Sequence, residues 1–543
     1  MACRSSDRRA RSYRIVGSGV SVAGGFFDVS KGYSGVECCG VETVAERPRH
    51  RAFSIATVEV THREVAMPAQ DPEAVEQWTP ARLIPAAGIR GAKEQEERAT
   101  SALLAVMSIV PSFGKNILKT VDAPAGTMTT FTEPRFETED GGTARPDGAI
   151  LVDRGRNHWS CLLEVKTGKS ALDAEQVDRY LAIANRDGFD AVLTISNEIT
   201  SGKGASPVKV DKRRIKKVTL GHISWFRILT EAVTEYEHHG VDDPEQSYIL
   251  GQLIAYLDDD RSGAAGFEGM GSEWVKVRDA ARNKTLRARD PGVREIAEDW
   301  AAFVEYMALR LRQRLGGQVA PVYPRTSIRA DRLDEYAESL GTEGLLEATI
   351  KVPDAVANIE ITADLGSRQV TTHARIKAPS QGFTKTRINW LLRQLKDVPD
   401  DLRITGRFAR TSKTASLMLP DVRKDPTGLV LASDPKRELV AFDVGLSKDM
   451  GNKGGKAKGS FVAETMSQVS AFYGEVLQDI QAWQPKAPRL KEEPEEPEEP
   501  EEPAPEPEQL ETAPPPPVAQ PESTEFQPQP FRPWPDDSDP SGG

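Results

Sequence analysis

Residues 161–170 read CLLEVKTGKS, an apolar run that ends in a carboxylate and an ammonium separated by one valine. Successive side chains of a β-strand point to opposite faces, so Glu164 and Lys166 would share a face. Such a charged pair is either a salt bridge at the end of a sheet or part of a functional site. The neighbouring sequence has to decide between these two interpretations.

The residues before this stretch predict its partner strand. RPDGAILVDR (145–154) is a second apolar run, and the Gly155-Arg156-Asn157 segment between the two runs is typical of a tight turn. In an antiparallel hairpin the start of the first strand lies beside the end of the second. Asp147 is therefore expected to lie close to Glu164 and Lys166.

This convergence predicts a metal site. Two carboxylates held close together repel each other unless a cation lies between them. Mg²⁺ or Mn²⁺, bound by Asp147 and Glu164 with the carbonyl of Val165 as a further ligand, would satisfy both and keep several waters. Lys166 would then position a water, help to deprotonate it, or offset charge that develops on a phosphate.

The wider pattern predicts an α/β fold. A helical pattern covers GAKEQEERATSALLAVMSIV (91–110), strand-like residues lie around 128–136, and the hairpin follows. A helix (DAEQVDRYLAIANRDG, 173–188), two strands (191–199 and 216–226) and a helix (227–239) come next. The order α-β-β-β-α-β-β-α predicts a mixed β-sheet flanked by helices.

Pro146-Asp147 followed by Glu164-Val165-Lys166, each at the end of its own strand, resembles the PD-(D/E)xK nuclease superfamily over about residues 91–235. The resemblance implies a restriction-endonuclease-like core. It also implies a further acidic residue on the upstream helix, for which we prefer Glu97 to its neighbour Glu96.

The downstream helix adds a second point of resemblance. Gln176 and Tyr180 have the Q-x3-Y spacing, which puts both side chains on one helical face. The pair looks like the third motif of the RecB-like exonuclease branch, where it helps to organise the site and to contact DNA.

The resemblance implies a Mg²⁺- or Mn²⁺-dependent phosphodiesterase that hydrolyses DNA in repair, recombination or defence against foreign DNA. The alternative is a catalytically inactive nucleic-acid-binding or scaffold protein on the same fold. In that case Lys166 only forms a salt bridge with Asp147 or Glu164 at the end of the sheet.

Two basic segments are candidate contacts for nucleic acid. KGASPVKVDKRRIKK (203–217) lies between two predicted strands, where it would either attract phosphates or form an ordinary solvated loop. SKDMGNKGGKAKGSF (447–461) is rich in glycine, and we expect a flexible segment that clamps nucleic acid or serves as a linker. It lacks the spacing of a phosphate-binding P-loop.

The chain divides by composition into four parts: an unstructured N-terminal extension (1–66), a nuclease-like domain (67–240), an α+β domain of unknown function (241–483) and a disordered Pro/Glu-rich tail (484–543). Met67 begins an ordinary-looking protein start, so residues 1–66 are either an upstream extension that is not translated natively or a disordered arm. The second domain has a long helical pattern around Val293–Leu315.

The tail holds four basic and 16 acidic residues, which accounts for the whole net charge of −12. The remaining chain is close to neutral, so the acidic balance does not argue against binding of nucleic acid. The terminal FQPQPFRPWPDD (526–537) sets aromatic residues between prolines. It is a candidate docking motif for a protein partner, or simply a set of aromatic residues in disordered sequence.

The four cysteines have no zinc-ligand spacing and suggest a reducing compartment. No run of 18 apolar residues occurs, so no membrane-spanning helix is expected. These features together predict a cytoplasmic protein.

Overall fold

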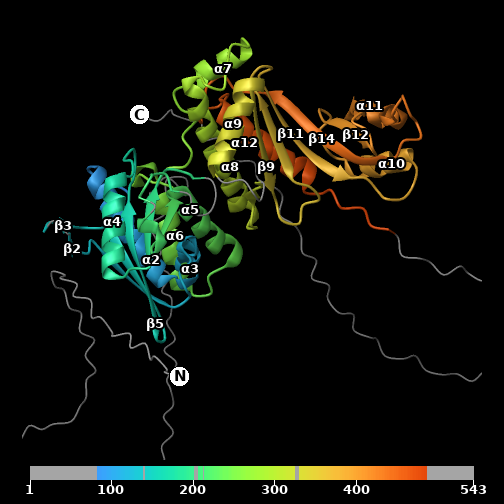
Figure 1. Cartoon of the computed structure of the whole chain (residues 1–543). Helices are drawn as coiled ribbons and strands as arrows, with labels where there is room; N and C mark the ends of the chain where they lie inside the picture. Colours follow the sequence, from blue (N-terminus) through green and yellow to red (C-terminus); the bar gives the residue numbers. More distant parts are fainter. Residues whose placement is uncertain (1–81, 139–140, 201–205, 212, 324–328, 486–543) are drawn as a thin grey trace, which may run out of the picture. The chain divides into compact units, whose positions relative to one another are not determined.

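The computed structural model describes residues 82–138, 141–200, 206–211, 213–323 and 329–485. The predicted N-terminal extension (1–66), and all but the first two residues of the predicted tail (484–543), lie outside the described residues. The described residues from Ile84 onward belong to one compact unit. Figure 1 shows its helices and strands.

The first sheet has five strands in the order β1-β4-β5-β6-β7. The pairs β1–β4 and β4–β5 are antiparallel, whereas β5–β6 and β6–β7 are parallel, so the sheet is mixed as predicted. The strands are β1 (Thr127–Thr132), β4 (Gly148–Arg154), β5 (Asn157–Val165), β6 (Ala191–Ser196) and β7 (Thr219–Ser224), and a separate short pair is formed by β2 (Phe136–Glu137) and β3 (Thr143–Ala144).

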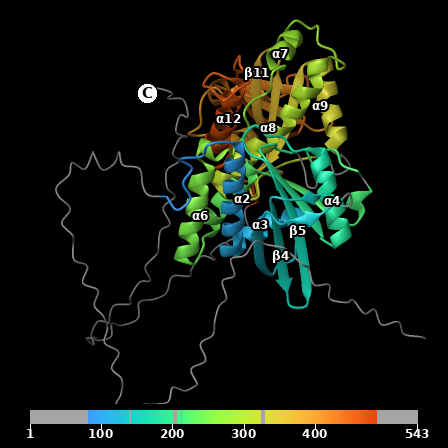
Figure 2. The ribbon, with the colours of Figure 1, turned by 90° about the vertical axis from the view of Figure 1, so that its left-hand side faces the viewer.

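Helices cover both faces of this sheet, as Figure 2 shows for α2 and α4. Alternate residues of β5 face opposite ways: Leu163 packs into the core on the α2 side and Leu162 into the core on the α4 side. The helices are α2 (Ala92–Ile109), α3 (Pro111–Leu118), α4 (Ala174–Asp187), α5 (Trp225–Val233) and α6 (Pro244–Leu257), with short helical turns at Lys119–Val121, Arg214–Lys216, Thr234–His239 and Asp260–Ser262.

The predicted hairpin is present and sets the geometry of the site. Gly148 pairs with Leu163 at one end of β4–β5, and Arg154 pairs with Asn157 at the other. Gly155 in the turn has a φ of 61°, a conformation that glycine adopts without steric cost. Asp147 directly precedes β4, and Lys166 directly follows β5, so both lie at the same end of the hairpin.

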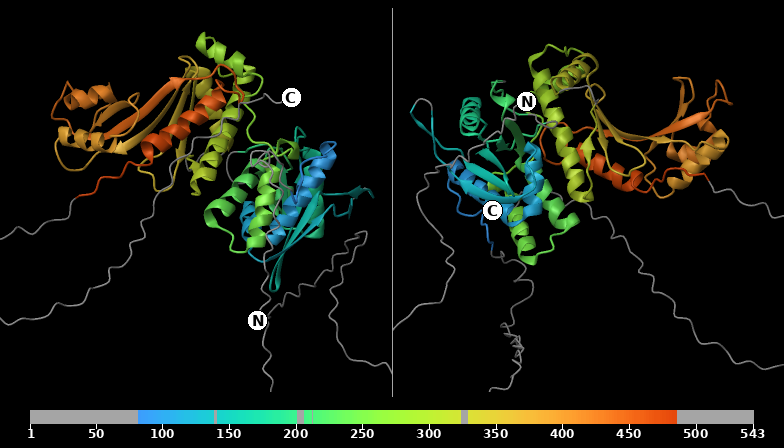
Figure 3. Two further views of the ribbon diagram at one scale, coloured as in Figure 1. Left: turned by 180° about the vertical axis from the view of Figure 1, so that it is seen from behind. Right: turned by 60° about the horizontal axis from the view of Figure 1, so that its bottom comes forward.

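The second sheet has seven strands in the order β13-β12-β14-β11-β10-β9-β8, all antiparallel. Figure 3 shows it from two further sides. Its strands are β8 (Ala320–Pro321), β9 (Leu345–Lys351), β10 (Ile359–Asp364), β11 (Gln369–Lys377), β12 (Arg403–Phe408), β13 (Thr414–Met418) and β14 (Leu439–Asp449). The associated helices are α7 (Trp274–Arg282), α8 (Pro291–Leu315), α9 (Arg329–Glu343), α10 (Thr384–Gln394), α11 (Leu419–Lys424) and α12 (Phe461–Phe472), with helical turns at Pro426–Leu429 and Tyr473–Leu477.

The two faces of the second sheet differ in character. On β11, Val370, Ala374 and Ile376 are buried, whereas the alternating residues from Gln369 to Lys377 are partly or fully exposed. The buried face packs against α12, where the side-chain amide of Gln468 donates to the carbonyls of Val370 and Leu446 at 2.9 Å each. The other face is polar, and we call it the open face.

The glycine-rich segment 447–461 differs from the flexible clamp or linker that we expected. Its first residues extend β14, and Gly454 accepts a hydrogen bond from the backbone of Met270 at 2.9 Å. The indole of Trp274 lies directly over Gly454, where any side chain would crowd it. Close packing therefore explains the glycines at positions 451 and 454, whereas Gly455 and Gly459 have open space around them.

The predicted boundary at residues 240/241 falls just before α6. This helix packs against α2 and α5, and its Leu250 and Leu253 are fully buried.

No single helix among the described residues is long and apolar enough to cross a membrane, although α2 and the following helical segment to Val121 pass that test as a pair bent by 115°.

Candidate functional site

Asp147, Glu164 and Lys166 converge at the end of the β4–β5 hairpin. The backbone N–H of Val165 donates to Oδ2 of Asp147 at 2.7 Å, which fixes this carboxylate beside the neighbouring strand. The Lys166 ammonium Nζ lies 2.5 Å from Oε1 of Glu164. The sequence-based prediction that these three side chains meet agrees with this geometry.

Glu164 has the most perturbed carboxyl group of the site. Its side chain is fully buried, and no group among the described residues makes a well-oriented hydrogen bond to either of its oxygens. Burial, together with the negative charge of Asp147, raises the pKa of Glu164 to about 8. Without a further cation, the carboxyl group would be largely protonated at neutral pH.

Asp147 and Lys166 respond to the same environment. Burial raises the pKa of Asp147, although the Val165 N–H and the Lys166 charge act in the opposite direction. Burial alone would lower the pKa of Lys166, but the carboxylates of Glu164, Asp147 and Glu96 raise it above its usual value. Lys166 therefore stays protonated at neutral pH.

The acidic residue that α2 brings to the site is Glu96, not the preferred Glu97. Oε1 of Glu96 lies 3.3 Å from Nζ of Lys166, and burial raises the pKa of Glu96. The Glu97 carboxylate instead pairs with Lys93 at 3.5 Å, one helical turn away on an exposed face. Consecutive helical residues point about 100° apart, so only one of the two can face the site.

Gln176 and Tyr180 lie on one face of α4 and hydrogen-bond to each other. The Gln176 amide donates to the Tyr180 hydroxyl at 3.0 Å, and this hydroxyl donates to the carbonyl of Arg145 at 3.0 Å. Burial and the nearby Glu164 charge raise the pKa of Tyr180. The pair thus holds the backbone two residues before Asp147.

A network that the sequence analysis missed fixes the loop after β5. The Asn197 amide donates to the carbonyls of both Gly168 and Gly263 at 2.9 Å each, and the Gly168 N–H donates to the Gly263 carbonyl at 2.9 Å. Gln95 accepts a hydrogen bond from the Thr167 hydroxyl at 3.2 Å.

One signal in the sequence could have pointed to part of this network. Asn197 directly follows the buried strand β6, which runs parallel to β5, so it had to lie near the end of β5. Gln95 and Gly263 have no comparable signal, because their partners are distant in the sequence.

The residues present fit a hard divalent cation. The buried Glu164 carboxyl group lies beside a second carboxylate, with the Lys166 ammonium 2.5 Å from its Oε1, and a cation would lower the energy of both ionised groups. Within the described ranges, no three His, Cys, Asp or Glu side chains lie close enough to hold a metal by themselves. The ligands would be Asp147, Glu164, the Val165 carbonyl and water, a set typical of Mg²⁺.

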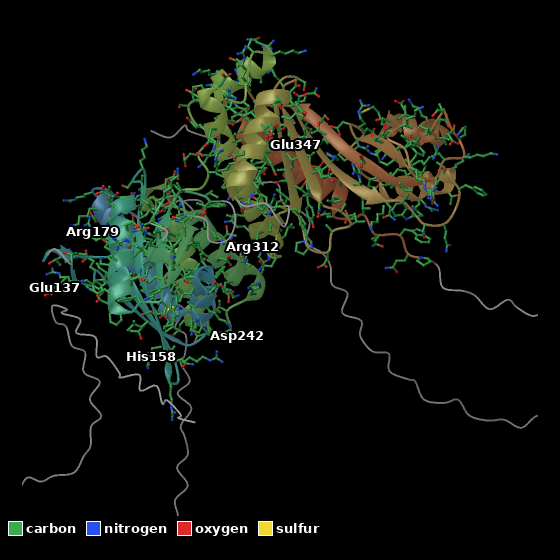
Figure 4. The ribbon with its side chains drawn as sticks, viewed as in Figure 1. Glu137, His158, Arg179, Asp242, Arg312 and Glu347 are labelled. Atoms are coloured by element: carbon green, nitrogen blue, oxygen red, sulfur yellow. The ribbon has the colours of Figure 1, made fainter. Side chains whose placement is uncertain are left out.

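The described part of the basic segment 203–217 lies beside α4. Arg213, Lys216 and Lys217 are exposed, and the Asn185 amide on α4 donates to the carbonyl of Arg214 at 2.9 Å. Residues 203–205 and Lys212 lie outside the described residues. Figure 4 labels Arg179 on α4, and His158 at the far end of the hairpin from the site.

No family model matches this chain, and the search of curated proteins finds no match. The interpretation of the site therefore depends on its own residues and geometry.

Proposed function

We propose that the protein is a metal-dependent DNA nuclease with a restriction-endonuclease-like core. The observation that carries the proposal is the buried Glu164 carboxyl group, which faces Asp147 and contacts Lys166 at the end of one hairpin. Burial of two carboxylates beside a lysine costs free energy of folding, and perturbed groups of this kind cluster at functional sites. Binding of a cation that coordinates phosphate would account for the arrangement.

Asp147 and Glu164 would hold Mg²⁺ or Mn²⁺, with the Val165 carbonyl as a third protein ligand. The bound cation would supply Lewis-acid stabilisation of the phosphate and activate water. The Val165 N–H orients Asp147 and favours its ionised form, because it donates a hydrogen bond to Oδ2, although burial raises the pKa of this carboxyl group.

Lys166 acts as a hydrogen-bond donor and a fixed positive charge. The surrounding carboxylates raise its pKa, so it is a poor base at neutral pH. With a cation bound by the carboxylates, the Lys166 ammonium would be available to a phosphate oxygen, where it would stabilise the charge that develops. Glu96 orients the ammonium from the other side.

DNA is the proposed substrate, in repair, recombination or defence against foreign DNA. The residues before the tail sum to no net charge, so the acidic balance of the whole chain does not oppose binding of DNA. The phosphate backbone of DNA is negatively charged, and its phosphates would be attracted to the Lys166 ammonium.

The second candidate is an inactive binding or scaffold protein on the same fold. The contacts of Lys166 with Glu164 and Glu96 favour it, since they pair the lysine without any metal. The two candidates differ in whether the carboxylates bind a divalent cation.

Cleavage of labelled linear DNA tests the proposal. The full chain is incubated with single- and double-stranded DNA in Mg²⁺, Mn²⁺ or EDTA, beside Asp147→Asn, Lys166→Met and the control Glu97→Gln. We expect metal-dependent cleavage by the wild type and the control, and a loss of about 100-fold or more in the other two variants. A folded wild type that cleaves neither DNA in either metal would overturn the proposal.

A further inference from the structure

Four basic side chains gather at one corner of the open face of the second sheet. Arg375 and Lys377 come from β11, Arg403 and Arg407 come from β12, and β14 lies between these two strands. The register places all four on the same face, because Arg375 and Lys377 are two residues apart and Arg403 and Arg407 four apart. We call this set the basic corner.

Asp443 organises the basic corner from its centre. Its Oδ1 lies 2.7 Å from Nε of Arg375, and its Oδ2 lies 2.6 Å from Nε of Arg407. Burial would raise the pKa of Asp443, but the hydrogen bonds from both guanidinium groups lower it below its usual value. One ionised carboxylate thus holds two arginines in place, and the corner keeps a net positive charge.

The guanidinium groups remain available to a ligand. The side chains of Arg375 and Arg407 are 49% and 42% exposed, although both contact Asp443. Lys377 and Arg403 are exposed, and no residue within the described ranges forms an ion pair with either. Preoriented guanidinium groups with free N–H donors are suited to phosphate oxygens.

An exposed aromatic ring lies at the same end of β11. Phe383 follows Lys377 by six residues and is 88% exposed, although phenylalanine is usually buried. The loop before it is fixed, because Arg387 donates to the carbonyls of Ser380 and Gly382 and to Leu439 on β14. The fold therefore presents this ring to solvent on a tethered loop that follows β11.

We propose that the basic corner and Phe383 bind a single-stranded segment of nucleic acid. The arginines and lysine contact successive phosphates, and the Phe383 ring stacks on an unpaired base. The basic corner and the Phe383 ring together favour a single strand over other ligands. An acidic peptide would contact the basic side chains but not the ring, and a duplex offers no unpaired base for stacking. The inference takes DNA from the proposed function but requires neither the metal nor Lys166.

Binding of the full chain to a labelled mixed-sequence 30-nucleotide DNA single strand in EDTA tests the inference, with salt varied. For Lys377→Glu with Arg403→Glu, we expect the dissociation constant to rise at least about tenfold, and the slope of log K against log salt to fall by about 1.4. For Phe383→Ser we expect an increase of about tenfold without a change of slope, and Phe383→Tyr should bind as the wild type does.

The matched control reverses two exposed lysines elsewhere, Lys276→Glu with Lys424→Glu, and should leave both quantities close to wild type. Melting curves establish that every variant is folded. Equal losses in the control and the test pair, or a wild type that does not bind, would overturn the inference.

A peptide of residues 484–525 tests the alternative that the acidic tail of the chain itself binds the basic corner. If the test pair weakens binding of this acidic peptide but not of the DNA strand, the corner holds the chain's own tail and the inference is wrong. If the wild type binds the DNA strand through the basic corner and Phe383 but cleaves no DNA, only the proposed function is contradicted.

Discussion

Glu164 links the chemistry of the site to the stability of the fold. The raised pKa means that folded Glu164 keeps its proton to about pH 8, whereas in the unfolded chain it is released near the usual value of 4.5. Between these two values the unfolded state binds fewer protons, so the free energy of unfolding falls as pH rises.

We therefore predict that metal-free wild type loses stability between pH 5 and pH 8, and that Glu164→Gln removes this loss. Relative to wild type, the variant should gain about 2 kcal/mol across this range. Urea unfolding in EDTA at several pH values measures it. Parallel pH profiles for the two proteins would be the contrary result.

Glu96 and Glu97 form a natural matched pair. Both are glutamates on the first turns of α2, but only Glu96 contacts Lys166. Glu96→Gln should lower the rate of DNA cleavage about tenfold, because the Lys166 ammonium loses its second orienting partner, and Glu97→Gln should stay within about twofold of wild type. Single-turnover cleavage compares them directly, and equal rates in the two variants would count against the role given to Glu96.

At the scale of the element, three contacts hold the loop that follows β5. They come from Gln95 on α2, from Asn197 directly after β6, and from the backbone of Gly263. Replacement of Asn197 by alanine removes two hydrogen bonds to backbone carbonyls, so the loop after Lys166 should become less ordered.

We expect Asn197→Ala to lower kcat about tenfold with KM little changed, and to cost about 1–2 kcal/mol of stability. Asn185→Ala is the control, since Asn185 also donates to two carbonyls but lies away from the site. It should lose similar stability and keep its kcat. A kcat loss shared by both variants would show that general destabilisation, and not loop position, is responsible.

The hairpin could be predicted from sequence because all its signals are local: two apolar runs, a glycine turn and charges at the ends. The choice of Glu97 over Glu96 was wrong although a signal was present: Glu96 lies three and four residues before the buried Ala99 and Thr100 of α2, so helical periodicity places it on the buried face. The ties made by Gln95 and Asn197 depend on tertiary contacts. For the second sheet, alternation predicts strands and faces, but β11 pairs with β14 across more than 60 residues, which no local pattern encodes.

At the scale of the whole molecule, a buried ion pair joins α8 to α5. Nη2 of Arg312 lies 2.7 Å from Oε2 of Glu231, and both side chains are almost fully buried (Figure 4 labels Arg312). Arg312→Met would leave the Glu231 carboxylate buried, with Arg227 as its more distant partner at 3.6 Å.

The expected cost of Arg312→Met is about 3 kcal/mol, and the double variant with Glu231→Gln should recover at least half of it, because no buried charge is then left unpaired. Urea unfolding of the wild type, both single variants and the double variant gives the coupling energy. Additive effects would show that the two side chains do not stabilise each other.

The central claim is that Asp147 and Glu164 together bind a divalent cation. Calorimetric titration of Mn²⁺ into the full chain tests it most directly, with Asp147→Asn, Glu164→Gln and the control Glu97→Gln measured alongside. We predict one saturable site in the wild type and the control, weakened by about tenfold or more in the other two variants. The same Mn²⁺ affinity in all four proteins, or no binding by the wild type, would contradict the claim.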